Sequence, residues 1–127
     1  MTLRTSNQLF DAYFTADSMA EVFSDQGRLQ GMLDFEAALA RAQAQVGLIP
    51  QAAVAPIAQA CLASLYDVDA LGVAIATAGN SAIPLVTALG KLIASEEAGA
   101  ERYVHLGATS QDVMDTGLVL QLRRALE

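Results

Sequence analysis

The sequence of 127 residues contains no tryptophan, one cysteine and one histidine. A single cysteine, Cys61, excludes a disulfide within the chain, and its apolar neighbours predict a buried thiol in a protein of the reducing cytoplasm. One histidine and one cysteine leave no pair with metal-ligand spacing, so we predict no metal site. Glycine-rich phosphate loops and nucleophile elbows are also missing from the sequence, and we predict no cofactor.

Basic residues are scarce: seven Lys and Arg against fourteen Asp and Glu give a net charge of −7. This balance disfavours a nucleic-acid partner and an anionic membrane surface, because both attract basic patches. The N-terminus lacks the continuous apolar core of a signal peptide. The most apolar stretch, 70–89, is interrupted at 79–81 and at Pro84, which favours two helices and a loop over a membrane span. We therefore expect a cytoplasmic protein.

Apolar residues are abundant, at 54% of the chain, and many of them are alanine. Strand-like runs of Val, Ile and Tyr are few, so the composition predicts an all-α fold of five or six closely packed helices. Apolar periodicity, glycines and prolines predict helices at 18–24, 25–46, 51–64, about 68–78, 81–95 and from about 110 to the end. The expected N-terminal caps are a Ser18–Glu21 capping box, Asp25, Asp67 or Asp69, and Thr109 or Ser110.

Two of these helices carry an unusual pattern. Glu36 and Gln43 fall on the apolar stripe of the long second helix, which predicts a buried polar contact. In the last helix, Leu118, Leu122 and Leu126 form a stripe with no obvious partner. The chain therefore reads as cut in mid-helix, or as shaped to pack against something else.

Polar residues gather where two helices begin, in "AGNSAIP" (78–84) and "HLGATSQD" (105–112). Free backbone N–H groups and the helix dipole favour a bound anion there, and uncharged hydroxyl and amide groups suit a carboxylate. The same residue types are also ordinary helix caps, and a lone histidine in a loop is often only hydrogen-bonded or solvated. Spacing alone leaves both interpretations open.

The segment "HLGATSQDVMDT" (105–116) resembles a signature region of the fumarase/aspartase superfamily. "GRLQGMLDFEAALARAQAQVGLIP" (27–50) resembles its first long helix, and "AGNSAIPLV" (78–86) resembles its first signature loop. The resemblance implies an N-terminal helical domain at 1–104, followed at 105–127 by the signature loop and the beginning of the first central-bundle helix. It also implies a homotetramer whose active sites draw loops from three subunits.

Within the superfamily, the resemblance points to the lactone-forming cycloisomerases of aromatic-compound degradation, in which a carboxylate of a small polycarboxylate substrate adds to a double bond. The residues implied to bind the substrate carboxylates are Asn80, Ser81, Thr109, Ser110 and Gln111. His105 would bind a carboxylate or assist proton transfer, and we favour binding. Asp112 is expected to cap the turn, and Arg28 and Lys91 to form surface ion pairs.

In full-length members the serine base lies far beyond residue 127, so we expect this chain to be inactive alone. Two alternatives stay open. One is another lyase of the superfamily, such as adenylosuccinate lyase. The other is a helical oligomerisation module without chemistry, which the leucine stripe at 118–126 supports.

Overall fold

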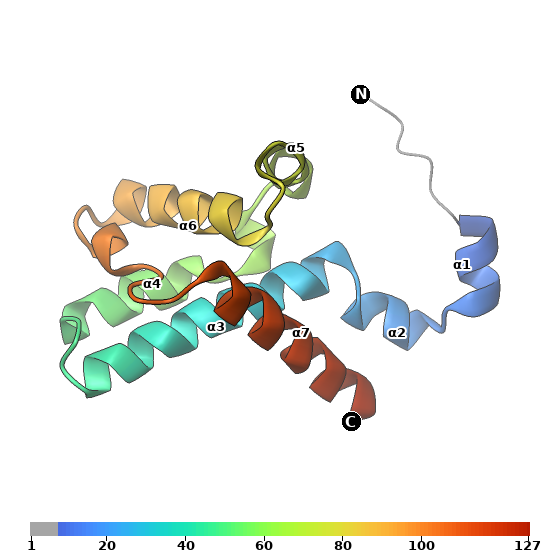
Figure 1. Ribbon diagram of the computed structural model, residues 1–127, viewed down its shortest axis with the longest axis horizontal. Coiled ribbons are helices and arrows are strands. Elements are labelled where there is room, and N and C mark those ends of the chain that lie inside the picture. The colour runs from blue at the N-terminus through green and yellow to red at the C-terminus, as the bar shows by residue number, and fades with distance from the viewer. Residues whose placement is uncertain (1–7) are drawn as a thin grey trace.

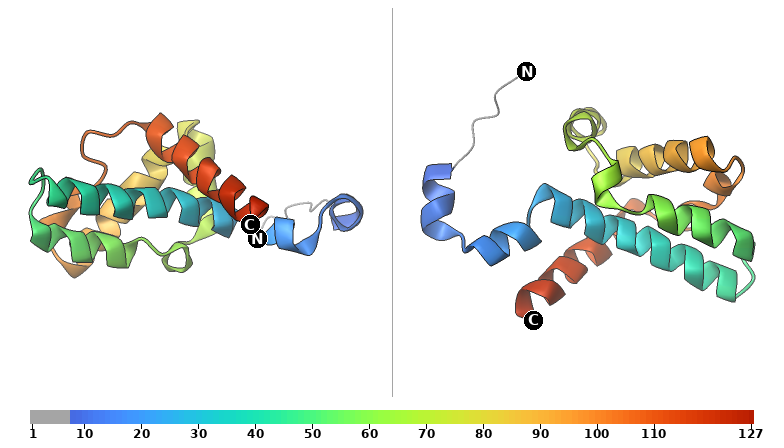
Figure 2. Two further views of the ribbon diagram at one scale, coloured as in Figure 1. Left: turned by 90° about the horizontal axis from the view of Figure 1, so that it is seen from below. Right: turned by 180° about the vertical axis from the view of Figure 1, so that it is seen from behind.

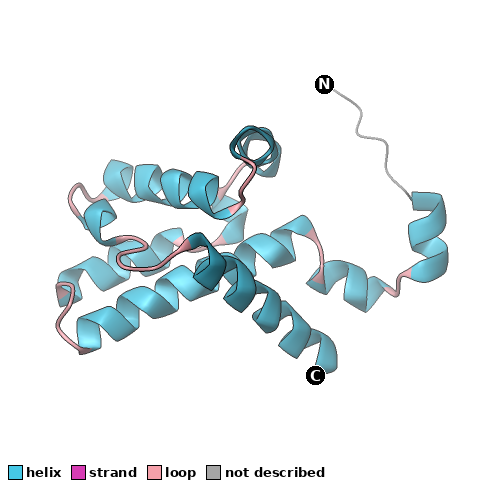
Figure 3. Ribbon diagram, viewed as in Figure 1, coloured by secondary structure: helices cyan, strands magenta, loops and turns pink. Residues whose placement is uncertain are grey.

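The computed structural model describes residues 8–127, which are helical almost throughout (Figure 1, Figure 3). This part of the chain contains no strand, and the predicted all-α fold is confirmed. The α-helices are α1 Gln8–Phe14, α2 Asp17–Val22, α3 Asp25–Gln45, α4 Val54–Ala60, α5 Val68–Ala78, α6 Ala82–Glu96 and α7 Ser110–Leu126. Short 3₁₀ turns occupy Gln51–Ala53, Ala63–Leu65 and Ala100–Tyr103.

The long helix α3 forms the centre of the molecule and contacts both α4 and α7. Helix α6 packs on α4 and α5, and α7 crosses α3 obliquely (Figures 1 and 2). Helix α1 extends away from this body in all three views, whereas α2 contacts α3 and α7. The most completely buried side chains of the helical body include Leu33, Ile57, Leu85, Leu89 and Val113. Each such side chain contributes roughly 1.5–3 kcal/mol of burial free energy.

Two glycines let α3 and α7 cross at very short range. A Cβ atom on Gly31 would lie 2.8 Å from the carbonyl oxygen of Gly117, and one on Gly117 would lie 3.0 Å from Cγ of Met32. Because no side chain fits between these backbones, the crossing requires glycine on both helices. The crossing fixes where α7, and the polar turn before it, lies relative to α3.

Several predicted helix ends are confirmed. Asp67 caps α5, since its Oδ1 accepts the N–H of Ala70 at 3.0 Å, and Thr109 caps α7. Helix α3 ends with Val46 as its C-cap, before Gly47 at φ 77°.

Two predicted caps are wrong. Helix α2 begins at Asp17, one residue before the expected capping serine, so Ser18 lies inside the helix and no side chain caps it. Helix α3 is capped by Ser24 and not by Asp25: the Ser24 hydroxyl accepts the N–H of Gly27 at 3.0 Å.

The helix predicted at 51–64 is broken into a 3₁₀ turn, α4 and a second 3₁₀ turn. The side chain of Gln30 explains the break after Ala60. Its Nε2 donates to the carbonyl of Cys61 at 3.0 Å, and its Oε1 accepts the N–H of Ala63 at 2.9 Å. These bonds satisfy backbone groups that a continuous helix would pair internally. Helix α1 was not predicted.

Cys61 is 4% exposed, which confirms the predicted buried thiol. Burial raises the pKa of this thiol to about 12, so it stays protonated and unreactive near neutral pH. None of the helices described here is both long enough and apolar enough to cross a membrane.

Candidate functional site

The first polar junction lies between α5 and α6. Gly79 ends α5 in the left-handed conformation, at φ 66°. The Oδ1 atom of Asn80 then accepts the N–H groups of Ala82 and Ile83, at 2.8 and 3.1 Å. Asn80 is therefore the effective cap of α6, and only its amide nitrogen remains available to a ligand. Ser81, the next residue, is half-buried and makes no hydrogen bond through its hydroxyl within the described residues.

The second junction opens α7. Thr109 and Asp112 form a capping box, in which Oδ2 of Asp112 accepts the N–H of Thr109 at 2.9 Å. This confirms that Asp112 caps the turn. Gln111 donates from Nε2 to Oδ1 of Asp115 at 2.6 Å, which holds its amide against the helix. Thr109 and Gln111 are exposed and Ser110 is half-buried, so all three remain within reach of solvent.

His105 lies in the turn before α7 and is tied to the core. Its Nδ1 lies 2.5 Å from Oε1 of Glu36, and its side chain is 17% exposed. One residue later, the carbonyl of Leu106 accepts a hydrogen bond of 2.6 Å from Nε2 of Gln43. The polar contact predicted for Glu36 and Gln43 is thus confirmed, and the turn at 105–106 is its partner. Sequence analysis could not name that partner, because the segments lie more than sixty residues apart.

Glu36 is 1% exposed, and burial in an apolar environment raises the pKa of its carboxyl group above the usual value of 4.5. The hydrogen bond with His105 acts in the opposite direction but offsets only part of this effect. The Glu36–His105 contact therefore links the buried face of α3 to the turn that precedes α7.

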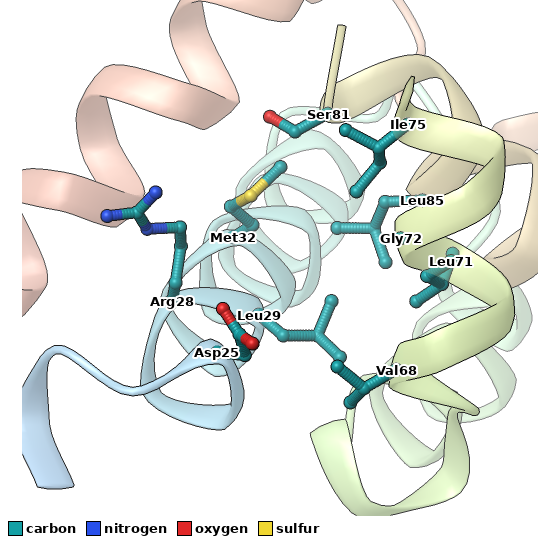
Figure 4. A pocket seen from close by; sticks show the side chains of 10 residues that line it. All are labelled: Asp25, Arg28, Leu29, Met32, Val68, Leu71, Gly72, Ile75, Ser81 and Leu85. Atoms are coloured by element: carbon teal, nitrogen blue, oxygen red, sulfur yellow. The ribbon is translucent and has the colours of Figure 1, made fainter. Parts of the chain in front are cut away.

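Ser81 and α7 line a common hollow. A cavity of about 280 Å³ lies between Arg28 and Met32 of α3, Ser81, and Met114, Asp115, Leu118 and Gln121 of α7. A second hollow of about 270 Å³ opens on the α5 side of Ser81 and also includes Arg28. Figure 4 shows Arg28 and Ser81 at one end of this second hollow, with Met32 between them. The two hollows therefore share the Arg28 guanidinium group and the Ser81 hydroxyl group, and each also includes a carboxylate, Asp25 in one and Asp115 in the other.

The structure thus brings Ser81 to the side of α7, next to the Asp115 carboxylate that holds Gln111. It does not place His105 among the residues that line either hollow. Arg28 was expected to pair on the surface. Neither Arg28 nor Lys91 forms an ion pair within the part of the chain that the structure describes, and Arg28 lines both hollows instead. The position of Arg28 in the sequence did not predict that it would line a cavity.

The arrangement suits recognition of an anion by groups that are mostly uncharged. Each of the two junctions carries hydroxyl or amide side chains at the start of a helix. Of these side chains only Ser81 lines a hollow, whereas Asn80, Thr109, Ser110 and Gln111 line neither. Arg28 adds one positive charge that is not neutralised by a neighbouring carboxylate at salt-bridge distance. In residues 8–127 no three His, Cys, Asp or Glu side chains are grouped as they would be to hold a metal ion.

A family model described as lyase matches residues 12–127, which is nearly the whole chain. The chain belongs to the fumarase/aspartase superfamily of lyases. Over 122 residues it is 75% identical to 3-carboxy-cis,cis-muconate cycloisomerase of Pseudomonas putida, a match that covers 96% of this chain and 29% of that protein. The chain thus spans less than a third of the length of this relative.

Solved structures of this lyase superfamily share the fold. The crystal structure of 3-carboxy-cis,cis-muconate lactonizing enzyme from Pseudomonas putida superimposes with a TM-score of 0.92 at 75% identity, over 94% of this chain and 27% of that chain. Fumarate lyase from Mesorhizobium sp. BNC1 superimposes with a TM-score of 0.76 at 39% identity, over 87% of this chain and 25% of that chain.

Proposed function

We propose that this chain provides part of the substrate-binding site of a 3-carboxy-cis,cis-muconate cycloisomerase, which interconverts 3-carboxy-cis,cis-muconate and its carboxymuconolactone. The observation that carries this proposal is the 75% identity to the Pseudomonas putida cycloisomerase across nearly the whole chain. In this proposal the protein acts in the cytoplasm, in protocatechuate degradation by the beta-ketoadipate pathway. Residues 1–104 are its N-terminal helical domain, and 105–127 begin the central bundle.

The chemistry explains why uncharged donors suit this site. During lactone formation, an oxygen of one substrate carboxylate bonds to an alkene carbon, and a proton is added to the neighbouring carbon. Before that proton arrives, negative charge concentrates on the carboxylate attached to the neighbouring carbon. Hydrogen-bond donors that are already in place stabilise such charge without reorganising. We assign this role to Thr109, Ser110 and Gln111 at the start of α7.

In this proposal, the first junction donates hydrogen bonds to the same substrate carboxylates. Asn80 offers its amide nitrogen, because its oxygen is used in capping α6, and Ser81 offers its hydroxyl. His105 binds a further carboxylate and remains a candidate for assisting proton transfer. The resemblance places the serine base beyond residue 127, so the chain alone is expected to be inactive.

The proposed assembly is a homotetramer in which loops from different subunits meet. Its support in this chain is the exposed leucine stripe of α7, where Leu118, Leu122 and Leu126 are 47%, 45% and 89% exposed. Such a stripe is typical of a helix that packs against others. The same stripe favours the alternative of a helical oligomerisation module without chemistry, so an experiment must separate assembly from turnover.

A chimera tests the proposal directly. Residues 1–127 replace the matching N-terminal segment of the Pseudomonas putida relative, and lactone formation from 3-carboxy-cis,cis-muconate is followed. We expect kcat/KM within about tenfold of that enzyme. Replacing Thr109 and Ser110 by alanine should then lower kcat/KM by at least about 100-fold, the usual cost of removing donors to a developing anion. Ser95→Ala, which removes an exposed hydroxyl on α6, is the matched control.

The outcomes distinguish the two candidate functions. Loss of turnover with an unchanged oligomeric state, measured by light scattering, supports the substrate site. Loss of assembly with normal turnover per folded tetramer supports the oligomerisation module. A chimera that assembles but forms no lactone contradicts the proposed function itself.

A further inference from the structure

Glu36 is an acidic side chain in a place where burial is costly. It lies in the middle of α3, its residue is 1% exposed, and its side chain is completely buried. Oε1 contacts Nδ1 of His105, whereas Oε2 is buried without a hydrogen-bond partner in the described part of the chain. An apolar residue of the same size would avoid this desolvation, so the carboxylate calls for a specific explanation.

His105 holds its ring in a defined orientation. It is the one non-glycine residue with positive φ among those described, at 58°, a backbone conformation that residues other than glycine adopt at a cost. Nδ1 faces the core and Glu36. Nε2 makes no hydrogen bond within the described residues and is not among their buried polar atoms without a partner, so this nitrogen reaches solvent. The ring therefore presents Nε2 outward.

A second contact holds the same turn. Gln43 lies seven residues after Glu36, two turns further along the same face of α3, and binds the carbonyl of Leu106. The turn closes with a hydrogen bond of 3.2 Å from the N–H of Ala108 to the carbonyl of His105. Helix α3 thus holds two consecutive residues, four and three positions before Thr109, the cap of α7.

We propose that Glu36 is a positioning residue that acts through His105 on substrate binding. By accepting the N–H of Nδ1, it fixes the ring with Nε2 outward, and in the protonated ring this nitrogen donates to a substrate carboxylate. The inference rests on the proposed function, in which His105 binds such a group. It assigns Glu36 a role although Glu36 does not touch the substrate.

The test uses the active chimera with four further variants. Glu36→Met removes the acceptor and keeps the shape, whereas Glu36→Gln keeps an oxygen for Nδ1. His105→Gln and the double variant Glu36→Met/His105→Gln complete a kinetic cycle. Gln30→Ala is the matched control, because Gln30 lies on the same helix and its hydrogen bonds go to Asp34, Cys61 and Ala63, not to the turn at 105–106.

We expect Glu36→Met to lower kcat/KM at least tenfold, mainly through KM, because the lost contact serves binding and a partner of a functional histidine has an effect of this size. Glu36→Gln should stay within about threefold of the parent chimera. In the His105→Gln background, Glu36→Met should cause no further loss. Gln30→Ala should leave kcat/KM unchanged, whatever it does to thermal stability.

Three results would overturn the inference while the parent chimera remains active. The first is an unchanged kcat/KM in Glu36→Met, and the second is losses that multiply in the double variant. The third is a His105→Gln protein with parental KM and kcat, which would leave Glu36 no residue to act through and applies even if Glu36→Met fails to fold. An inactive parent chimera would instead overturn the proposed function, and the inference with it.

Discussion

Several side chains in this protein are held by residues that are distant in sequence. For Glu36, the buried position makes the free energy of unfolding depend on pH. Burial raises the pKa of its carboxyl group above 4.5, so the folded chain binds this proton more tightly than the unfolded chain does. The free energy of unfolding should therefore decrease as pH rises from 4.5 through the raised pKa. Urea unfolding followed by circular dichroism measures this.

Glu36→Gln provides the comparison, because an amide does not titrate. The difference in unfolding free energy between the parent and this variant should change across that pH range, since groups that do not contact Glu36 cancel and only the Glu36–His105 pair differs. Parallel curves would contradict the prediction.

From the sequence, the position of Glu36 on an apolar stripe predicted a buried polar contact, but its partner could not be predicted. Periodicity reports which face of a helix is buried, not which distant loop lies against that face.

At the scale of helices, the crossing of α3 and α7 depends on backbone contact. Gly31→Ala would place a methyl group 2.8 Å from the Gly117 carbonyl, so the helices must separate. Overpacking of this kind lowers the unfolding free energy by about 1–3 kcal/mol. The higher helix propensity of alanine offsets at most about 1 kcal/mol of this loss. We expect a net decrease in the unfolding free energy, measured by urea titration.

Gly90→Ala is the control for this prediction. Gly90 lies inside α6, and an added Cβ there would meet nothing within 4 Å. This variant should gain stability, by up to about 1 kcal/mol, through helix propensity alone. If Gly31→Ala stabilised the chain as Gly90→Ala does, the close crossing would not exist in solution.

Sequence patterns predicted the helices whose ends are set locally. Asp67, Gly79 and Thr109 act within a few residues of their own backbone, and their types reveal this. The end of α4 was missed because the side chain that stabilises it, Gln30, comes from another helix. At the candidate site the local caps were likewise predictable, whereas the hollow that joins Arg28 and Ser81 depends on how three helices pack.

At the scale of the whole molecule, the outer face of α7 carries leucines that no other described element covers. Leu122 is 45% exposed and Leu126 is 89% exposed, although both continue the helix that the α3 crossing holds in place. If this face packs in the proposed tetramer, Leu122→Glu in the chimera should bury a charge there and shift the protein to smaller species in light scattering. Leu65→Glu places the same charge on an exposed leucine outside α7, and it should leave assembly unchanged. A Leu122→Glu chimera that stays as large as its parent would show that this face is not part of the interface.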